Sequence, residues 1–337
     1  MLNKPRTVLY TESRSEFYFT VIDMGTETFI YSNDYNLHKG NHLKTRLYRS
    51  TGTDKFGQAS MIFKKNCLSH NFHPFRGADG MLYGIGGMHS WKNQSLWHKI
   101  KSFAHFKDVF LEEFGRDYKG NEDRFKKANY RLINEKFMLE YSDGLYLFKS
   151  EDGISWIRIK RIITPRHPGF HSSLAWKSTE FDGAICCLHD GQKYILYLRD
   201  NVKEGMRNIQ YATSTDLLNW SEFKPIKIKY NEGDNYYFPS FFKYQDKLYG
   251  LLPFYTYSSA CIRFCQSSDG ITWKIKRELL TGKPEIHSGK RKNYYHPATG
   301  YVEDVDKIYV YIQHNYMGSN KKMDVYLKRY SIDKCKL

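Results

Sequence analysis

The sequence predicts an all-β fold made of repeated four-stranded units, and three observations support this. A phrase of the form Ser-x-Asp-x-x-x-Trp occurs at Ser150–Trp156, Ser214–Trp220 and Ser267–Trp273. Each copy follows a strand-like run of aromatic and aliphatic residues. Tyr and Phe, which favour strands, number 28 and 22 among 337 residues. Units that repeat in this way indicate a β-propeller, and with an N-terminal pair of strands at Thr7–Thr11 and Glu16–Ile22 the count is five.

Each unit is expected to begin with an entry phrase and to continue with a tight turn and a second strand. The entry phrases are Asn71–Phe75, Gly169–Ser173, Tyr237–Phe241 and Tyr295–Thr299. The turns with their second strands are Asp79–Gly87, Gly191–Leu198, Gln245–Tyr255 and Val305–Ile312.

The closing phrase has a physical reason to recur. Side-chain oxygens of Ser and Asp bond the backbone of their own loop, and the following Gly takes a positive φ. The Trp then fills the gap between neighbouring sheets. We therefore expect Trp156, Trp220 and Trp273 to be buried at equivalent places. In the first unit, Thr45–Ser50 is expected to be the third strand and Thr51–Phe56 a degenerate form of the same turn.

The blades are predicted at about 1–65, 66–163, 164–229, 230–285 and 286–337. No linker rich in Pro, Gly or Ser divides them, so we expect a single domain. The chain ends in the strand-like run Asp324–Ile332, which is predicted to pair with, or lie beside, the N-terminal strand and close the ring.

Blade two is too long for four strands. Apolar residues recur at helical spacing within the excess: Leu96, Ile100, Phe103, Phe110 and Phe114. This predicts a helical insertion at about 91–140, made of one or two amphipathic helices that lie over the propeller. It would wall one side of the active face or form an oligomer contact.

Composition limits the partners. The formal charge of +16 is spread through every unit, which favours anionic partners, and no basic run is interleaved with aromatics as in a specific nucleic-acid platform. The sequence has no run of about 18 apolar residues, so no membrane span is predicted. The start of the chain lacks the apolar core of a signal peptide. None of the six cysteines is in a Cys-x-x-Cys spacing. We therefore expect reduced thiols and a cytoplasmic protein, with a virus-infected cell as one setting.

Five units with these turns, and inner strands entered by x-Pro, resemble the five-bladed propellers of glycoside hydrolases: the arabinanase/xylosidase, invertase/levansucrase and anhydro-galactosidase families. The resemblance covers almost the whole chain except Trp91–Glu140. It implies carboxylates where the inner strands begin, as an Asp in blade one, an Asp before Pro in blade two and a Glu in blade three. This chain departs from that pattern, because its entry positions carry His73, His171, Phe238 and His296.

Strands alternate in direction within a blade, so the start of the first strand and the end of the second lie on one face. The predicted catalytic residues on this face are Asp200, Asp234, His171, His73 and Glu204. The predicted substrate-binding residues are Arg199, Arg207, His89, Glu232, Tyr255, His296 and His314. The N-terminal unit is expected to add Asp23.

The leading hypothesis is a glycan-active enzyme that cleaves a glycosidic bond in the central funnel. Such cleavage needs one group to protonate the leaving oxygen and a second, usually a carboxylate, to attack or to activate water. Asp200 and Asp234 are the preferred carboxylates, and His171 or His73 is the candidate acid. The expected partner is a carbohydrate or glycoside. If it is anionic or phosphorylated, Arg199 and Arg207 are expected to bind its anionic group.

Two alternatives stay open. One is sugar transfer to or from phosphate or a nucleotide-sugar, which needs a single carboxylic acid and basic groups for the phosphate. The other is a non-catalytic propeller, glycan-binding or virion-structural. No cofactor is expected, although three histidines near one axis, His73, His171 and His296, are an alternative site for a divalent metal.

Overall fold

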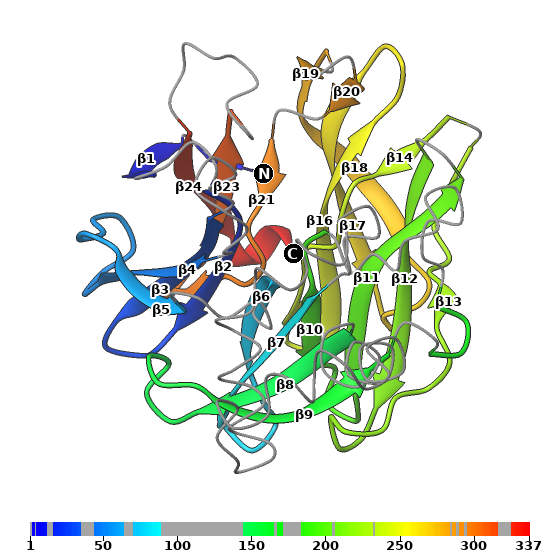
Figure 1. The fold of residues 1–337 in the computed structure, drawn as a ribbon. Helices are drawn as coiled ribbons and strands as arrows, with labels where there is room; N and C mark the ends of the chain where they lie inside the picture. The colour runs from blue at the N-terminus through cyan, green and yellow to red at the C-terminus, as the bar shows by residue number, and fades with distance from the viewer. Residues whose placement is uncertain are drawn as a thin grey trace, which may run out of the picture.

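The structure, a computed structural model, describes residues 2–3, 5–11, 16–34, 44–63, 70–88, 144–164, 167–170, 183–203, 206–231, 233–283, 285–287, 290–292, 295–315 and 325–337. Five antiparallel sheets are set around a common axis (Figure 1). The chain is therefore the predicted all-β, five-bladed propeller. The helical insertion expected at 91–140 lies outside the described residues. Within those residues the only helix is the 3-10 turn η7 (Lys334–Lys336), and no helix has the length and apolar content that crossing a bilayer requires.

Each blade is a meander whose first strand is innermost. The strands of blades one to three are β2 (Glu16–Asp23), β3 (Thr28–Asp34), β4 (Lys44–Ser50), β5 (Ser60–Phe63), β6 (His70–Arg76), β7 (Leu82–Met88), β8 (Gly144–Ser150), β9 (Ile157–Ile163), β10 (Cys186–His189), β11 (Tyr194–Lys203), β12 (Met206–Ser214) and β13 (Lys224–Pro225).

Blades four and five have an inner strand in two short pieces. Their strands are β14 (Asn235–Tyr236), β15 (Phe241–Tyr244), β16 (Lys247–Tyr255), β17 (Ala260–Ser267), β18 (Lys274–Gly282), β21 (His296–Pro297), β22 (Val302–Glu303), β23 (Lys307–His314), β24 (Tyr326–Asp333) and β1 (Arg6–Tyr10). A separate hairpin of β19 (Glu285–His287) and β20 (Lys290–Lys292) connects the two blades.

The N-terminal strand closes the ring, as predicted. β1 pairs with β24 from Arg6 opposite Arg329 to Tyr10 opposite Tyr326. The backbone N–H of Asn3 continues this contact with the carbonyl oxygen of Ser331 at 3.0 Å. Residues 6–10 were expected in blade one, but β2 is the innermost strand there and has only β3 beside it in its sheet. β1 is instead the outer strand of blade five.

The core lies in the wedges between neighbouring blades. Between blades three and four, for example, Leu252 and Phe254 of β16 pack with Ile195 of β11 and Ile209 of β12. Five cysteines lie in the described part of the chain, and all five are free thiols. Four of them are buried in these wedges or beside them: Cys186, Cys187, Cys261 and Cys265.

The repeated turn forms as its sequence predicts. Asp Oδ1 accepts two backbone N–H groups at 2.7–2.8 Å in each copy, with the carboxylates of Asp152, Asp216 and Asp269 as acceptors. The next residue has a positive φ: Gly153 (72°), Leu217 (65°) and Gly270 (70°). Its carbonyl oxygen accepts the indole Nε1–H of Trp156, Trp220 or Trp273 at 3.0–3.1 Å. The three Trp residues are therefore equivalent, although Trp273 is 3% exposed and the other two are half-buried.

A tyrosine from the preceding blade bonds some of these turns. Tyr31 donates its hydroxyl to Gly153 O at 2.7 Å, and Tyr197 donates to Gly270 O at 2.8 Å. In the same way Tyr311 of blade five bonds Thr53 O at 3.0 Å in blade one. Phe56 packs on Tyr311 there, with the ring centroids 6.3 Å apart. Residues 51–56 therefore take the place of the repeat turn, with Phe56 where other blades carry Trp.

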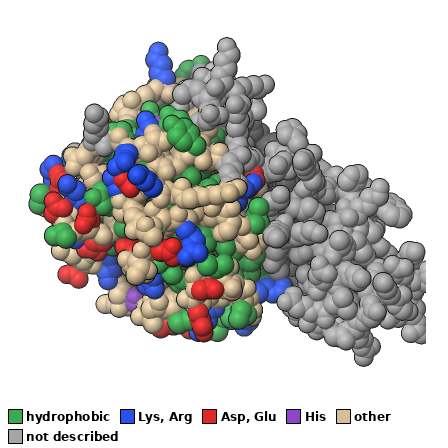
Figure 2. Space-filling view, turned by 90° about the vertical axis from the view of Figure 1, so that its left-hand side faces the viewer, with side chains coloured by type: hydrophobic (Ala, Val, Ile, Leu, Met, Phe, Trp, Pro, Cys, Tyr) green, Lys and Arg blue, Asp and Glu red, His purple; other side chains and the backbone are tan. Residues whose placement is uncertain are grey.

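Charges of both signs are interspersed on the side of the molecule that carries β3 to β5 (Figure 2). Some of them are paired. Nη2 of Arg49, in β4, lies 2.6 Å from Oε2 of Glu27, and both side chains are partly exposed. Pairs of this kind contribute little stability, because water and salt screen them.

Replacing the three Trp residues tests the packing of the repeat. Trp273→Ala should cost about 3–5 kcal/mol, because it leaves a cavity against Phe241, whose ring stacks 4.1 Å away. Trp156→Ala and Trp220→Ala should cost less, since both side chains are half-buried. Urea denaturation measures all three, with the exposed Ile154→Ser in the same kind of turn as control. If Trp156→Ala lowered the free energy of unfolding as much as Trp273→Ala does, the predicted dependence on side-chain burial would be contradicted.

The turn aspartates should make stability depend on acid pH. The backbone N–H of Ser155 lowers the pKa of Asp152, and that of Asn219 does the same for Asp216. These groups bind protons more weakly in the folded chain, so their contribution is complete above an unfolded pKa of about 3.9 and is lost as the pH falls below it. Denaturation midpoints between about pH 5 and pH 2 should fall less steeply in an Asp152→Asn/Asp216→Asn variant. Ile154→Ser, in the same turn, removes no titratable group and should keep the wild-type slope.

Candidate functional site

One end of the ring, which we call the entry face, is where inner strands begin and second strands end. Blades three and four place five of the predicted residues at this end: Arg199 and Asp200 near the end of β11, Arg207 near the start of β12, Asp234 just before β14, and Tyr255 at the end of β16. Strand β12 contacts β14, so these groups meet at the junction of the two blades.

Arg207 is held at this junction by blade four. Its backbone N–H donates to Asn235 Oδ1 at 3.0 Å, and its guanidinium donates to the Tyr255 hydroxyl at 3.0 Å. The guanidinium carbon also lies 4.9 Å from the centroid of the Tyr237 ring. Burial raises the pKa of Tyr255, so its hydroxyl stays protonated beside the arginine. The result is an oriented cation between two aromatic rings.

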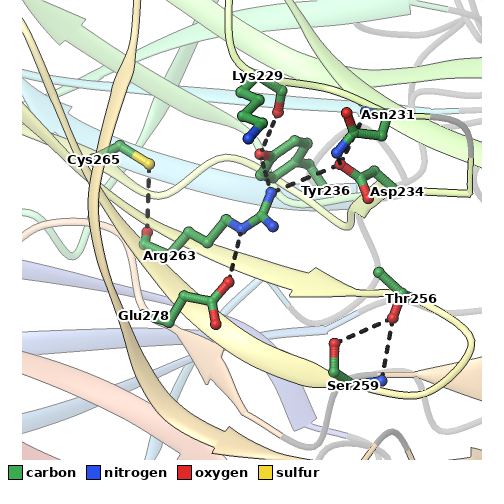
Figure 3. A network of polar contacts seen from close by, with 9 residues as sticks. All are labelled: Lys229, Asn231, Asp234, Tyr236, Thr256, Ser259, Arg263, Cys265 and Glu278. Atoms are coloured by element: carbon green, nitrogen blue, oxygen red, sulfur yellow. Dashed lines mark hydrogen bonds and ion pairs between the residues drawn. The ribbon is translucent and has the colours of Figure 1, made fainter.

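Asp234 belongs to a polar network at the same junction (Figure 3). Its Oδ2 accepts the backbone N–H of Asn231 at 3.0 Å and lies 3.8 Å from the guanidinium of Arg263. Arg263 in turn donates to the Tyr236 hydroxyl at 2.6 Å and pairs with Glu278 at 3.4 Å. The sequence analysis missed Arg263, although an arginine between apolar residues in the strand Ala260–Ser267 was a signal for a buried partner.

Asp200 and Asp234 act on one tyrosine. Asp200 is 2% exposed and Asp234 is 5% exposed. Burial first, and then the charges of Asp234 and Asp200, raise the pKa of Tyr230. Asp200 pairs with Asn208 of β12, and Asp234 immediately precedes β14, which β12 contacts, so acids from two neighbouring blades lie at one junction.

His73 lies deeper, among the inner strands. Its Nδ1 is 3.2 Å from Thr20 Oγ1 and 3.0 Å from Thr299 Oγ1, and its Nε2 is 3.4 Å from Cys187 O. Burial lowers the pKa of His73 to about 4, so the ring is neutral at neutral pH. This arrangement links blades one, two, three and five, and it supplies no imidazolium for proton donation.

The histidines of the entry phrases are not equivalent. His73 pairs with Ile85 in the middle of β7, whereas His296 pairs with Gln313 near the end of β23. The reason is that β6 begins at His70, three residues before His73, whereas β21 begins at His296 itself. His296 is 2% exposed, and its ring lies 5.1 Å from that of Tyr237. Through Tyr237 it adjoins Arg207.

His314 lies at the entry-face end of β23. Its Nε2 is 3.0 Å from the Tyr330 hydroxyl, and its ring stacks on Tyr326 at 5.2 Å. Burial, and after it the charge of Lys328, lowers the pKa of His314 to about 3. The ring is therefore neutral and aromatic in character at neutral pH.

The remaining predicted residues divide into two groups. Four of them lie outside the described residues: His89, His171, Glu204 and Glu232. Of the three histidines in the metal hypothesis, the structure therefore describes only His73 and His296. The described part of the chain contains no group of three His, Cys, Asp or Glu side chains arranged to hold a metal. Asp23 was placed on the wrong face: it ends β2, at the opposite end of the ring from Glu16, and its Oδ1 accepts the N–H of Gly25 at 2.8 Å.

Blade one carries a buried acidic group that the sequence analysis also missed. Glu16 begins β2 and accepts the hydroxyls of Ser32 and Tyr48, both at 2.7 Å. Arg46 pairs with Asp34 at 3.0 Å and lies 3.4 Å from Glu16. Burial raises the pKa of Glu16. The position of Glu16 as the first residue of the inner strand was the available signal, and its backbone carbonyl also accepts the side-chain amide of Gln313 from blade five at 3.0 Å.

Comparison with known proteins gives a likeness of structure alone. No protein-family model matches the chain, and a search of curated proteins finds no relative. Among solved structures, a glycoside hydrolase has a TM-score of 0.56 at 11% identity over 96% of this chain and 90% of that one. The N-acetylgalactosamine deacetylase from F. plautii, in complex with blood group B trisaccharide, has 0.56 at 10% identity over 99% and 96%. The α-L-arabinanase of Penicillium chrysogenum, complexed with arabinobiose, has 0.50 at 13% identity over 99% and 98%. The chain is thus a five-bladed β-propeller whose fold is similar to that of arabinanase-type glycoside hydrolases.

Proposed function

We propose that the protein is a glycan-active enzyme that cleaves a glycosidic bond at the junction of blades three and four on the entry face. The observation that carries this proposal is the position of Asp200 and Asp234 at the contact of β12 with β14: Asp200 pairs with Asn208 of β12, and Asp234 immediately precedes β14. Glycoside hydrolysis needs two carboxyl groups on opposite sides of one bond, one as proton donor and one as base or nucleophile. The similar structures, which include a glycoside hydrolase and an arabinanase, support the choice of reaction class.

The two acids have different surroundings, which favours different roles. Asp234 lies beside the guanidinium of Arg263 and accepts the N–H of Asn231, contacts that fix the direction in which its carboxylate points. We therefore assign it the role of base or nucleophile. Asp200 is left as the proton donor, because the neutral ring of His73 cannot fill that role.

Arg207 and its tyrosines are assigned to substrate binding. The rings of Tyr237 and Tyr255 are buried and orient the Arg207 guanidinium, whose remaining N–H groups would donate to sugar oxygens. A carbohydrate that carries a carboxylate, sulfate or phosphate would gain a forked contact with Arg207.

Isosteric substitution of the two acids tests this assignment. Asp200→Asn and Asp234→Asn should each lower kcat by at least about 100-fold, because an amide neither donates a proton as an acid nor acts as a base. The measurement is turnover of a panel of aryl glycosides and of arabinobiose, with and without inorganic phosphate. Asp246→Asn, on an exposed hairpin at the other end of β16, is the matched control and should keep wild-type turnover.

The outcomes separate the alternatives. Full activity in both variants would remove this pair of acids from the mechanism. Turnover that requires phosphate would indicate sugar transfer instead of hydrolysis. A wild-type protein that binds glycans and turns over none of the panel would favour the non-catalytic propeller.

Arg207→Lys provides a second measurement at the same site. A lysine keeps the charge but cannot reproduce the planar fork or the stacking on Tyr237. We expect KM to rise by about tenfold with a small change in kcat, since one charge-assisted contact contributes about 1.5–3 kcal/mol. A change confined to kcat would instead indicate that Arg207 acts on the reacting bond.

A further inference from the structure

A row of rings crosses blade five at the entry face. It consists of four residues: Tyr10 at the end of β1, Tyr326 at the start of β24, His314 at the end of β23, and Tyr295 just before β21. Tyr10 is directly opposite Tyr326, and Tyr326 is directly opposite His314. We call these four residues the blade-five ring row.

The rings are continuous in space. Their centroids are 6.0 Å apart from Tyr10 to Tyr326, 5.2 Å from Tyr326 to His314, and 4.8 Å from His314 to Tyr295. Side chains directly opposed across strands stand on the same side of a sheet, so the register itself produces the row. The row therefore runs from the outer edge of the blade toward the axis.

Exposure increases outward from His314. His314 is 6% exposed, Tyr326 is partly exposed, and Tyr10 is 66% exposed, while Tyr295 on the inner side is also partly exposed. Tyr10 thus lies largely in solvent, and the middle of the row is fixed by the contact of His314 with the Tyr330 hydroxyl at 3.0 Å. Packing of the core does not account for a tyrosine as exposed as Tyr10.

The chemistry of the row fits a carbohydrate. Tyrosine presents a flat apolar face with a hydroxyl at its edge, which matches the C–H face and the hydroxyl rim of a sugar ring. Lys328 lies on the same side, with its Nζ 5.3 Å from the centroid of Tyr326, and adds a donor for sugar oxygens. A row this polar at its edges is a poor surface for an apolar protein partner.

The inner end of the row reaches the candidate site. Tyr295 is followed by His296, whose ring is 5.1 Å from that of Tyr237. Tyr237 lies beneath the guanidinium of Arg207. The row and the candidate site thus lie at the same end of the ring, and the backbone between Tyr295 and His296 joins them.

We propose that the blade-five ring row binds the part of a carbohydrate chain that extends outward from this junction. The proposal rests on the proposed function for the position of the cleaved bond, although binding to the row requires no turnover. It specifies the ligand as an oligosaccharide or polysaccharide long enough to reach from Tyr237 to Tyr10, instead of a single glycoside.

Retention in native gels that contain soluble polysaccharide tests the proposal without enzyme turnover. The probes are arabinan, xylan and heparin, so that neutral and anionic chains are compared. We expect at least one of them to retain the wild-type protein. Tyr10→Ala and Tyr10→Ala/Tyr326→Ala should weaken that retention, the double variant by about tenfold, since a stacked ring contributes about 0.5–1.5 kcal/mol. Tyr10→Phe keeps the ring and should keep most of the binding.

The control lies in the same blade. Tyr309 is a partly exposed tyrosine of β23 near the other end of the strand, where its hydroxyl bonds Asp304 at 2.9 Å. Tyr309→Ala should leave retention unchanged. Circular dichroism shows whether Tyr326→Ala folds, and the single Tyr10→Ala variant carries the test if it does not, because Tyr10 is largely in solvent.

Three results would overturn the proposal. The first is that no polysaccharide retains the wild-type protein, and the second is that Tyr10→Ala binds as wild type does. The third is that Tyr10→Ala loses binding to single-stranded DNA while glycan binding is unchanged, because bases also stack on such rings. If the protein is inactive on every glycoside but its retention still depends on Tyr10, glycan binding by the ring row is supported and the proposed enzymatic function is contradicted.

Discussion

The propeller depends on one backbone carbonyl in each repeat turn. The residue after the turn aspartate presents its oxygen to the indole of its own blade, and in two of the three Trp-containing turns also to a tyrosine hydroxyl from the preceding blade. A buried acceptor with two donors joins the turn, the wedge and the neighbouring sheet in a single contact. The blades are thereby held at a fixed angle, and the residues at the entry face keep their positions relative to one another.

This constraint explains why the fold could be predicted well. Aspartate, a residue of positive φ and tryptophan are each required by a specific contact, so the phrase survives in recognisable form at Ser150–Trp156, Ser214–Trp220 and Ser267–Trp273. Glycine is not required at the position after the aspartate. Leu217 takes a positive φ there, as Gly153 and Gly270 do in the other two turns, and its side chain is buried. The place of β1 was harder to predict, since pairing with a strand more than 300 residues away leaves no local signal.

The site could be predicted only in part. Strand direction correctly brought Asp200, Arg207 and Tyr255 to one end of the ring, because alternation is a geometric rule. The partners of Asp234 and His73 are side chains distant in the sequence, such as Arg263 and Thr299. A motif before proline does not show where its strand begins: β6 begins at His70, three residues before His73, whereas β21 begins at His296.

The pairing of β1 with β24 also has a consequence for synthesis. β1 is synthesised more than 300 residues before β24, so its backbone stays without this partner until β24 has been made. Long-range pairing of this kind slows folding, and a strand that waits for its partner is open to contact with other chains. The ring can therefore close through this pair only after β24 has been translated.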